Sequence, residues 1–199
     1  MTAPTPPALR VLHAVRTLGF AGADRIAAQV DLPEEQVLGH LLDDQAAGHV
    51  ARSAFAGSDG WSLTEEGRRH GERMLAAELD AVDARDVVED VHRDFLPLNA
   101  EVSRACTAWQ LAELGIGATS PPIEATVATL TRAAEALAEL ERRLTSHLLR
   151  FAGYHRRFAD ALRRAADDPA WITATDRDSC HLVWFQLHED LIATLGLTR

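Results

Sequence analysis

The stretch that decides the fold is Asp24–Gly71, DRIAAQVDLPEEQVLGHLLDDQAAGHVARSAFAGSDGWSLTEEGRRHG. Apolar residues recur in it at helical spacing, which predicts one short helix over Ala23–Val30 and another beginning after Pro33. Residues that favour strands follow over Val50–Ala54 and Trp61–Leu63, so a two-stranded hairpin is expected between them. The stretch therefore predicts two helices followed by a hairpin.

The flanking sequence completes this pattern. Leu9, Leu12 and Val15 predict a helix before the stretch, and Thr64 is a good N-cap for a helix after the hairpin. The resulting order resembles the winged helix-turn-helix of the MarR-type transcriptional regulators. The segments that carry the resemblance are RIAAQVDLPEEQVLGHLLDDQAAGHVAR and WSLTEEGRRH, and it covers about the first 75 residues.

The rest of the chain has helical periodicity. We expect Pro97 to break a helix, a long amphipathic helix to run from Ile123 to about Phe151, and Asp178 or Ser179 to cap a last helix. The predicted fold is mainly α, a winged helix-turn-helix with a small two-stranded wing plus a C-terminal α-helical bundle. The predicted domains are residues 1–76 for the winged helix and residues 77–199 for dimerisation and ligand sensing. Long amphipathic helices favour a homodimer.

Composition limits the class of protein. No window of 18 apolar residues is present, and the N-terminus lacks a charged region followed by an apolar run, so we expect a cytoplasmic protein without a membrane partner. Two cysteines are too few for a disulfide framework. The formal net charge of −10 opposes non-specific attraction to phosphate backbones.

The resemblance implies that the helix after Pro33 enters the major groove of DNA and that the hairpin approaches the minor groove or the backbone. The residues predicted to contact DNA are Gln36, His40, Arg52 and Arg25. A glutamine can read adenine, and a histidine can contact a base or a phosphate. However, residues 1–76 hold 7 Arg against 10 Asp or Glu, and the wing tip Gly57–Gly60 lacks the arginine usual in MarR-type wings.

Two oppositely charged segments follow. Glu78–Asp94 is rich in acids, and Arg142–Arg164 is rich in arginines. Arg150, Arg157 and Arg164 recur every seven residues and would line one face of a continuous helix. The arginines can form an anion site, or they can form structural ion pairs, which is the interpretation we favour.

The segment from Asp178 to Asp190 concentrates residues capable of chemistry. His181, Trp184 and His188 would share one helical face, and Cys106 and Trp109 could meet them across the core. Three interpretations stay open: a metal or haem site, a ligand pocket with tryptophan walls, and a packed amphipathic helix. The pocket residues predicted for a ligand are Cys106, Trp109, His181, Trp184 and His188.

No motif for nucleophilic, metal-dependent or phosphate-binding catalysis is present, so neither catalytic residues nor a resident cofactor or metal are predicted. The predicted function is a dimeric transcriptional regulator that binds a palindromic DNA operator and senses a small-molecule effector. The alternative is a winged-helix protein that does not bind DNA. It would serve as a partner-binding, small-molecule-binding or catalytic protein through the helical half.

Overall fold

The structure is a computed structural model that describes residues 4–55, 57–116 and 122–197. These residues are mainly helical, with one two-stranded antiparallel sheet. Contacts divide them into two units, residues 4–83 with 192–197 and residues 84–191. The predicted boundary after residue 76 lies inside a helix that ends at Ala81. No helix among the described residues is both long and apolar enough to cross a membrane.

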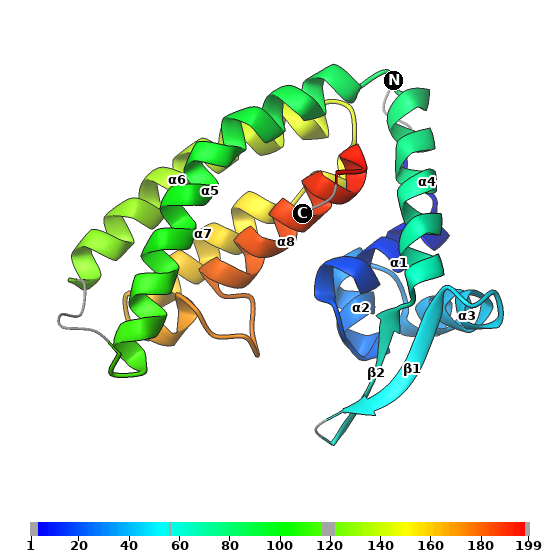
Figure 1. Cartoon of the computed structure of the whole chain (residues 1–199), viewed down its shortest axis with the longest axis horizontal. Helices are drawn as coiled ribbons and strands as arrows, with labels where there is room; N and C mark the ends of the chain where they lie inside the picture. The colour runs from blue at the N-terminus through cyan, green and yellow to red at the C-terminus, as the bar shows by residue number, and fades with distance from the viewer. Residues whose placement is uncertain (1–3, 56, 117–121, 198–199) are drawn as a thin grey trace. The chain divides into compact units, whose positions relative to one another are not determined.

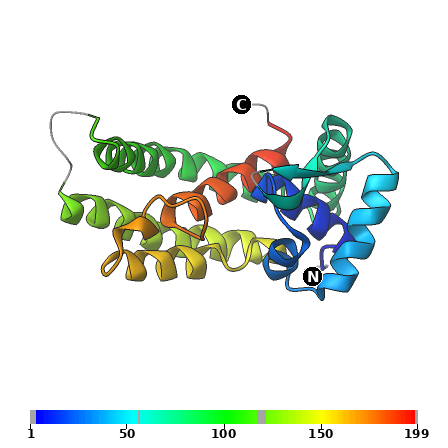
Figure 2. The same ribbon diagram turned by 90° about the horizontal axis from the view of Figure 1, so that it is seen from below.

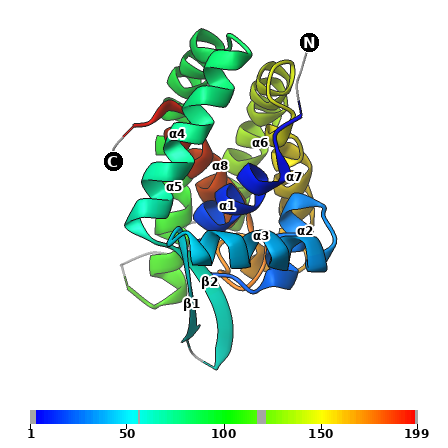
Figure 3. The ribbon, with the colours of Figure 1, turned by 90° about the vertical axis from the view of Figure 1, so that its right-hand side faces the viewer.

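The first unit contains three helices, a hairpin and a fourth helix (Figures 1 and 3). Their bounds are α1 Pro7–Leu18, α2 Ala23–Val30, α3 Glu34–Ala46, β1 Val50–Phe55, β2 Ser58–Leu63 and α4 Glu65–Ala81. The predicted order of elements is confirmed. The predicted strands Val50–Ala54 and Trp61–Leu63 are too short, because the strands pair as far as Phe55 with Ser58, and Ala56 lies outside the described residues.

An apolar core holds α1, α2, α3 and the hairpin together. It contains Val11, Leu12, Ala14, Val15, Ala21, Ile26, Ala27, Val30, Val37, Leu41, Val50 and Trp61. Helices α1, α2 and α3 supply residues three or four positions apart, which is the spacing that puts side chains on one face. Of these three helices α3 contributes least, since only Val37 and Leu41 of its residues are buried.

The hairpin is joined to the helices at its base. The backbone of Ala21, between α1 and α2, pairs with Trp61 of β2 through hydrogen bonds of 2.9 and 3.2 Å. At the other end of β2, the hydroxyl of Thr64 accepts a hydrogen bond from the amide of Gly67 at 2.9 Å, so the predicted N-cap of α4 is confirmed.

The second unit is built from long helices. Its elements are α5 Arg85–Glu113, α6 Ile123–Thr145, the 3₁₀ turn η1 Leu149–Phe151, α7 Tyr154–Ala165, the 3₁₀ turn η2 Pro169–Trp171 and α8 Cys180–Leu195. Helix α5 packs along α6, and α6 packs along α7 (Figures 1 and 2). Ser179 caps α8 by accepting from the amide of Leu182 at 3.2 Å, as predicted. By its contacts the last turn of α8, from Ile192, belongs to the first unit.

The prediction that Pro97 breaks a helix is wrong, because α5 continues through it. A proline inside a helix removes one backbone hydrogen bond and costs about 3 kcal/mol. Phe95 precedes Pro97 and Val102 follows it, and both are fully buried. Burial on each side anchors the two halves of α5 to the same core, so tertiary packing outweighs the local preference.

The predicted helix from Ile123 to Phe151 is also too long, since α6 ends at Thr145. The carboxylate of Glu141 accepts hydrogen bonds from the backbone amides of Gly153 at 3.0 Å and His155 at 2.6 Å. Glu141 thus caps the start of α7 and turns the chain back along α6. Gly153, the N-cap of α7, has a φ of +102°, which favours glycine.

A buried ion pair joins α8 to the turn between α6 and α7. The guanidinium of Arg150 lies 2.5 Å from the carboxylate of Asp190, and their side chains are 5% and 3% exposed. The hydroxyl of Tyr154 donates to the other oxygen of Asp190 at 3.0 Å. Burial, and then the neighbouring Asp190 charge, raise the pKa of Tyr154 well above its ordinary value. Asp190 is therefore the acceptor that satisfies two buried donors.

Candidate functional site

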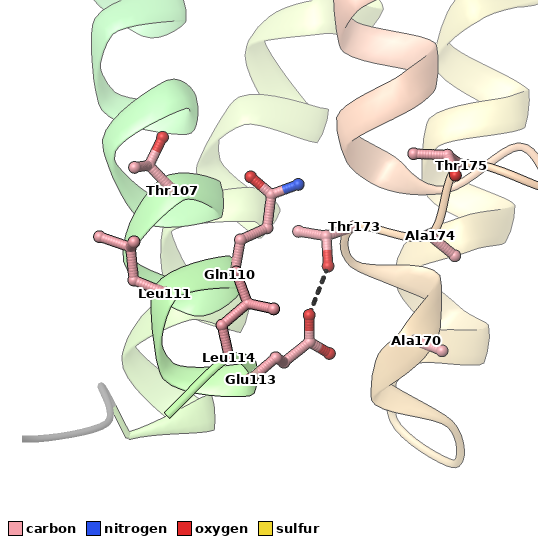
Figure 4. A pocket seen from close by; sticks show the side chains of 9 residues that line it. All are labelled: Thr107, Gln110, Leu111, Glu113, Leu114, Ala170, Thr173, Ala174 and Thr175. Carbon is pink, nitrogen blue, oxygen red and sulfur yellow. Dashed lines mark hydrogen bonds between the residues drawn. The ribbon is translucent and has the colours of Figure 1, made fainter. Parts of the chain in front are cut away.

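The second unit contains a cavity of about 550 Å³ at the C-terminal end of α5 (Figure 4). It is lined by Thr107, Gln110, Leu111, Glu113 and Leu114 of α5 and by Ala170, Thr173, Ala174 and Thr175 of the segment before α8. Small-molecule sites usually measure about 300–1,000 Å³, so this volume suits an organic molecule better than a single ion.

Polar groups face each other across this cavity. The hydroxyl of Thr173 donates to the Glu113 carboxylate at 3.1 Å, and Gln110 extends from α5 toward the same segment (Figure 4). The side chains of Gln110, Thr107 and Thr175 make no hydrogen bond with any residue that the structure describes. Their donors and acceptors are available to a bound molecule.

None of the five residues predicted for a ligand pocket lines this cavity. Trp184 is a core residue, because its ring packs against Phe95 and Phe158 with centroids 4.9 and 5.4 Å apart. Its indole N–H donates to Asn99 at 3.0 Å. The ring of His188 lies 5.5 Å from that of Phe95. Trp184 and His188 thus pack about the same phenylalanine.

The other three predicted pocket residues are Cys106, His181 and Trp109. Cys106 is fully buried, and burial raises its thiol pKa to about 12, which makes the thiol a poor nucleophile. His181 is half-buried, and burial lowers its pKa. The indole nitrogen of Trp109 is buried without a hydrogen-bond partner among the described residues. Within that same part of the chain, no group of three or more His, Cys, Asp or Glu is arranged to hold a metal ion.

The arginine-rich segment does not form one continuous helical face. Arg150 lies in η1, whereas Arg157 and Arg164 lie in α7. Arg150 pairs with Asp190 and Arg157 with Asp178, while Arg164 stacks over Trp171 at 4.5 Å. Arg143 of this segment pairs with Asp94 of the acidic segment at 2.6 Å. These contacts agree with the ion-pair interpretation.

In the first unit, the residues predicted to contact DNA lie in α2, α3 and β1. Gln36 is exposed on α3, and His40 of the same helix is partly buried. Arg52 of β1 pairs with Asp59 across the hairpin at 3.1 Å, with both side chains more than half exposed. Arg25 of α2 forms no ion pair with any residue in the described ranges.

The outer face of α3 carries a glycine at its centre. A Cβ atom built on Gly39 would meet no atom within 4 Å. Glycine in a helix interior costs about 0.5–1 kcal/mol relative to alanine. The packing of this chain does not require a glycine there.

No pattern in the sequence predicts the cavity. Thr107, Gln110 and Glu113 belong to no motif, and Thr173 and Thr175 lie in a segment without periodicity. These residues line one cavity because of where α5 ends relative to the turn η2. In contrast, α3 could be predicted because its caps, its apolar stripe and the following hairpin all agree.

Comparison with known proteins adds no family. No protein-family model, no curated protein and no solved structure matches this chain.

Proposed function

We propose that the chain is a DNA-binding transcriptional regulator whose first unit is a winged helix of the MarR type. The order α1–α2–α3–β1–β2–α4 supports this proposal, and so does the pairing of Ala21 with Trp61, which adds a third backbone segment to the hairpin. In this proposal α3 enters the major groove and the hairpin lies beside it. A homodimer would place two copies of α3 on a palindromic operator.

The observation that carries the proposal is the exposed glycine of α3. An unneeded glycine lowers the stability of the helix, and a common reason to keep one is the close approach of another backbone. Gln36, Gly39 and Asp43 are all exposed and follow one another at helical spacing. A bare backbone between two polar side chains lets a helix lie deep in a groove.

The deciding experiment is a fluorescence-anisotropy titration with the DNA upstream of the coding sequence. We expect half-saturation below about 1 μM and an affinity that falls steeply with salt, because phosphate contacts release counterions. DNA of scrambled sequence is the control. Equal binding of both DNAs, or no binding at low salt, would rule out the regulator.

Replacing Gly39 by alanine tests the role of α3 directly. We expect the variant to unfold at higher urea concentration, with a stability gain of about 0.5–1 kcal/mol. We also expect it to bind operator DNA about tenfold more weakly, a loss of about 1.4 kcal/mol, because the methyl group occupies the approach surface. Anisotropy and urea melts measure the two effects separately.

Gly71→Ala is the matched control for this variant. Gly71 lies in α4, where a Cβ would make only an ordinary contact with Leu12 at 3.6 Å. It should therefore gain similar stability and keep full DNA affinity. If Gly39→Ala binds DNA as tightly as Gly71→Ala, α3 does not lie against the groove at that point.

A second candidate function is contact with another protein. Two leucines one turn apart on α3 are exposed, Leu38 at 37% and Leu42 at 56%. Glu34 and Glu35 begin the helix, and α3 contains no arginine. An acidic helix with an apolar stripe suits a basic protein surface better than a phosphate backbone. Failure of the DNA titration would favour this function.

A further inference from the structure

We propose that the cavity at the end of α5 binds a small organic cation, a primary ammonium group carried on an apolar body. This site lies within the second unit and is independent of DNA binding by the first. A small organic cation would therefore be the ligand class of the helical half.

The charge of the cavity favours a cation. Among the described residues that line it, Glu113 is the one that is ionisable. The cavity also lies at the C-terminus of the 29-residue helix α5, where the helix dipole gives a partial negative charge. A carboxylate and a helix C-terminus in the same place disfavour anions.

The hydrogen-bonding groups define how such a cation would be held. One oxygen of Glu113 accepts from Thr173, which fixes the carboxylate in place. An ammonium group has three donors and no acceptor. Its donors can bond to the carboxylate, the Gln110 carbonyl oxygen and a threonine hydroxyl, all of which belong to residues that line the cavity.

The lining offers one carboxylate, and the affinity of a site for Ca²⁺ or Mg²⁺ depends on the number of its charged ligands, so this cavity suits an organic cation better than a bare divalent ion. The apolar part of the lining is formed by Leu111, Leu114, Ala170 and Ala174. An aliphatic or aromatic body next to the ammonium group would contact these side chains.

Three probes of one shape test the charge preference. Phenethylamine, 2-phenylethanol and 3-phenylpropanoate share an aromatic body and differ in carrying an ammonium, a hydroxyl or a carboxylate group. We expect isothermal titration of the full chain to show phenethylamine binding about tenfold more tightly than the alcohol, with no binding of the acid. Binding of the acid as tight as that of the amine, or no amine binding at 10 mM, overturns the proposal.

Glu113→Gln locates the site. Glutamine keeps an acceptor for the Thr173 hydroxyl, so the variant removes the charge and not the hydrogen bond. We expect it to abolish the tenfold preference for the amine over the alcohol and to leave the melting temperature unchanged. Glu101→Gln, on the same helix outside the cavity, should keep that preference. An unchanged preference in Glu113→Gln would place the amine elsewhere and overturn the assignment. Because these titrations contain no DNA, their failure leaves the regulator proposal standing.

Discussion

Replacing Asp190 by alanine is expected to lower the free energy of unfolding of the helical unit by about 3–5 kcal/mol. The variant removes the Asp190 carboxylate from the guanidinium of Arg150, whose side chain is 5% exposed. It also removes the acceptor of the buried Tyr154 hydroxyl. Urea unfolding followed by tryptophan fluorescence measures this loss, since Trp109, Trp171 and Trp184 all lie in this unit.

Asp94→Ala is the matched control. Asp94 also pairs with an arginine of another segment, Arg143 at 2.6 Å, but its side chain is 54% exposed. An exposed pair contributes about 0–1 kcal/mol, so this variant should be close to the parent protein. Equal losses from the two aspartates would mean that burial does not decide the strength of the Asp190 pair.

A double substitution keeps the test informative if Asp190→Ala does not fold. Removing both charges, as Arg150→Met with Asp190→Leu, leaves neither ion unpaired in the interior. Apolar replacement of a buried pair is often neutral or stabilising, so we expect the double variant to recover most of the lost stability. A double variant as unstable as Asp190→Ala would show that packing around Arg150, and not its charge, sets the cost.

The predictable parts of this fold are those where local signals agree. Thr64 and Ser179 are recognisable as caps because a hydroxyl before an apolar helical pattern has one common use. Pro97 misleads because its local cost is outweighed by Phe95 and Val102, whose burial cannot be read from one sequence. Glu141 is missed for the same reason, since the amides it caps lie twelve and fourteen residues away.

The candidate sites also differ in how far the sequence predicts them. The exposure of Gly39 follows from periodicity, because this residue lies on the side of α3 opposite Val37 and Leu41, whereas the 37% exposure of Leu38, which lies beside Val37, does not follow. The cavity does not follow from periodicity, since it needs the end of α5 and an irregular segment about 60 residues later. Trp184 and Cys106 are predicted for a ligand pocket because tryptophan and cysteine can take part in binding. Their side chains are also largely apolar, and burial in the core is common for both residue types.

Gly67 is the residue whose substitution should most disturb the first unit. A Cβ atom at this position would lie 1.9 Å from the backbone oxygen of His49 and 2.7 Å from its carbonyl carbon. That oxygen cannot move freely, because it accepts hydrogen bonds from both the amide and the hydroxyl of Thr64, each at 3.0 Å. Gly67→Ala must therefore separate α4 from the start of β1, and we expect a loss of about 3 kcal/mol.

Gly71→Ala again serves as the comparison, one helical turn further along α4. It adds the same methyl group where only Leu12 lies near, so the helix should gain about 0.5–1 kcal/mol. The two variants together should differ by about 4 kcal/mol in urea unfolding followed by circular dichroism. A difference below about 1 kcal/mol would show that the contact between Gly67 and His49 is not tight. The close approach matters for function because it fixes α4 to the point where α3 ends and the hairpin begins, so the proposed DNA-reading helix and wing depend on this one missing side chain.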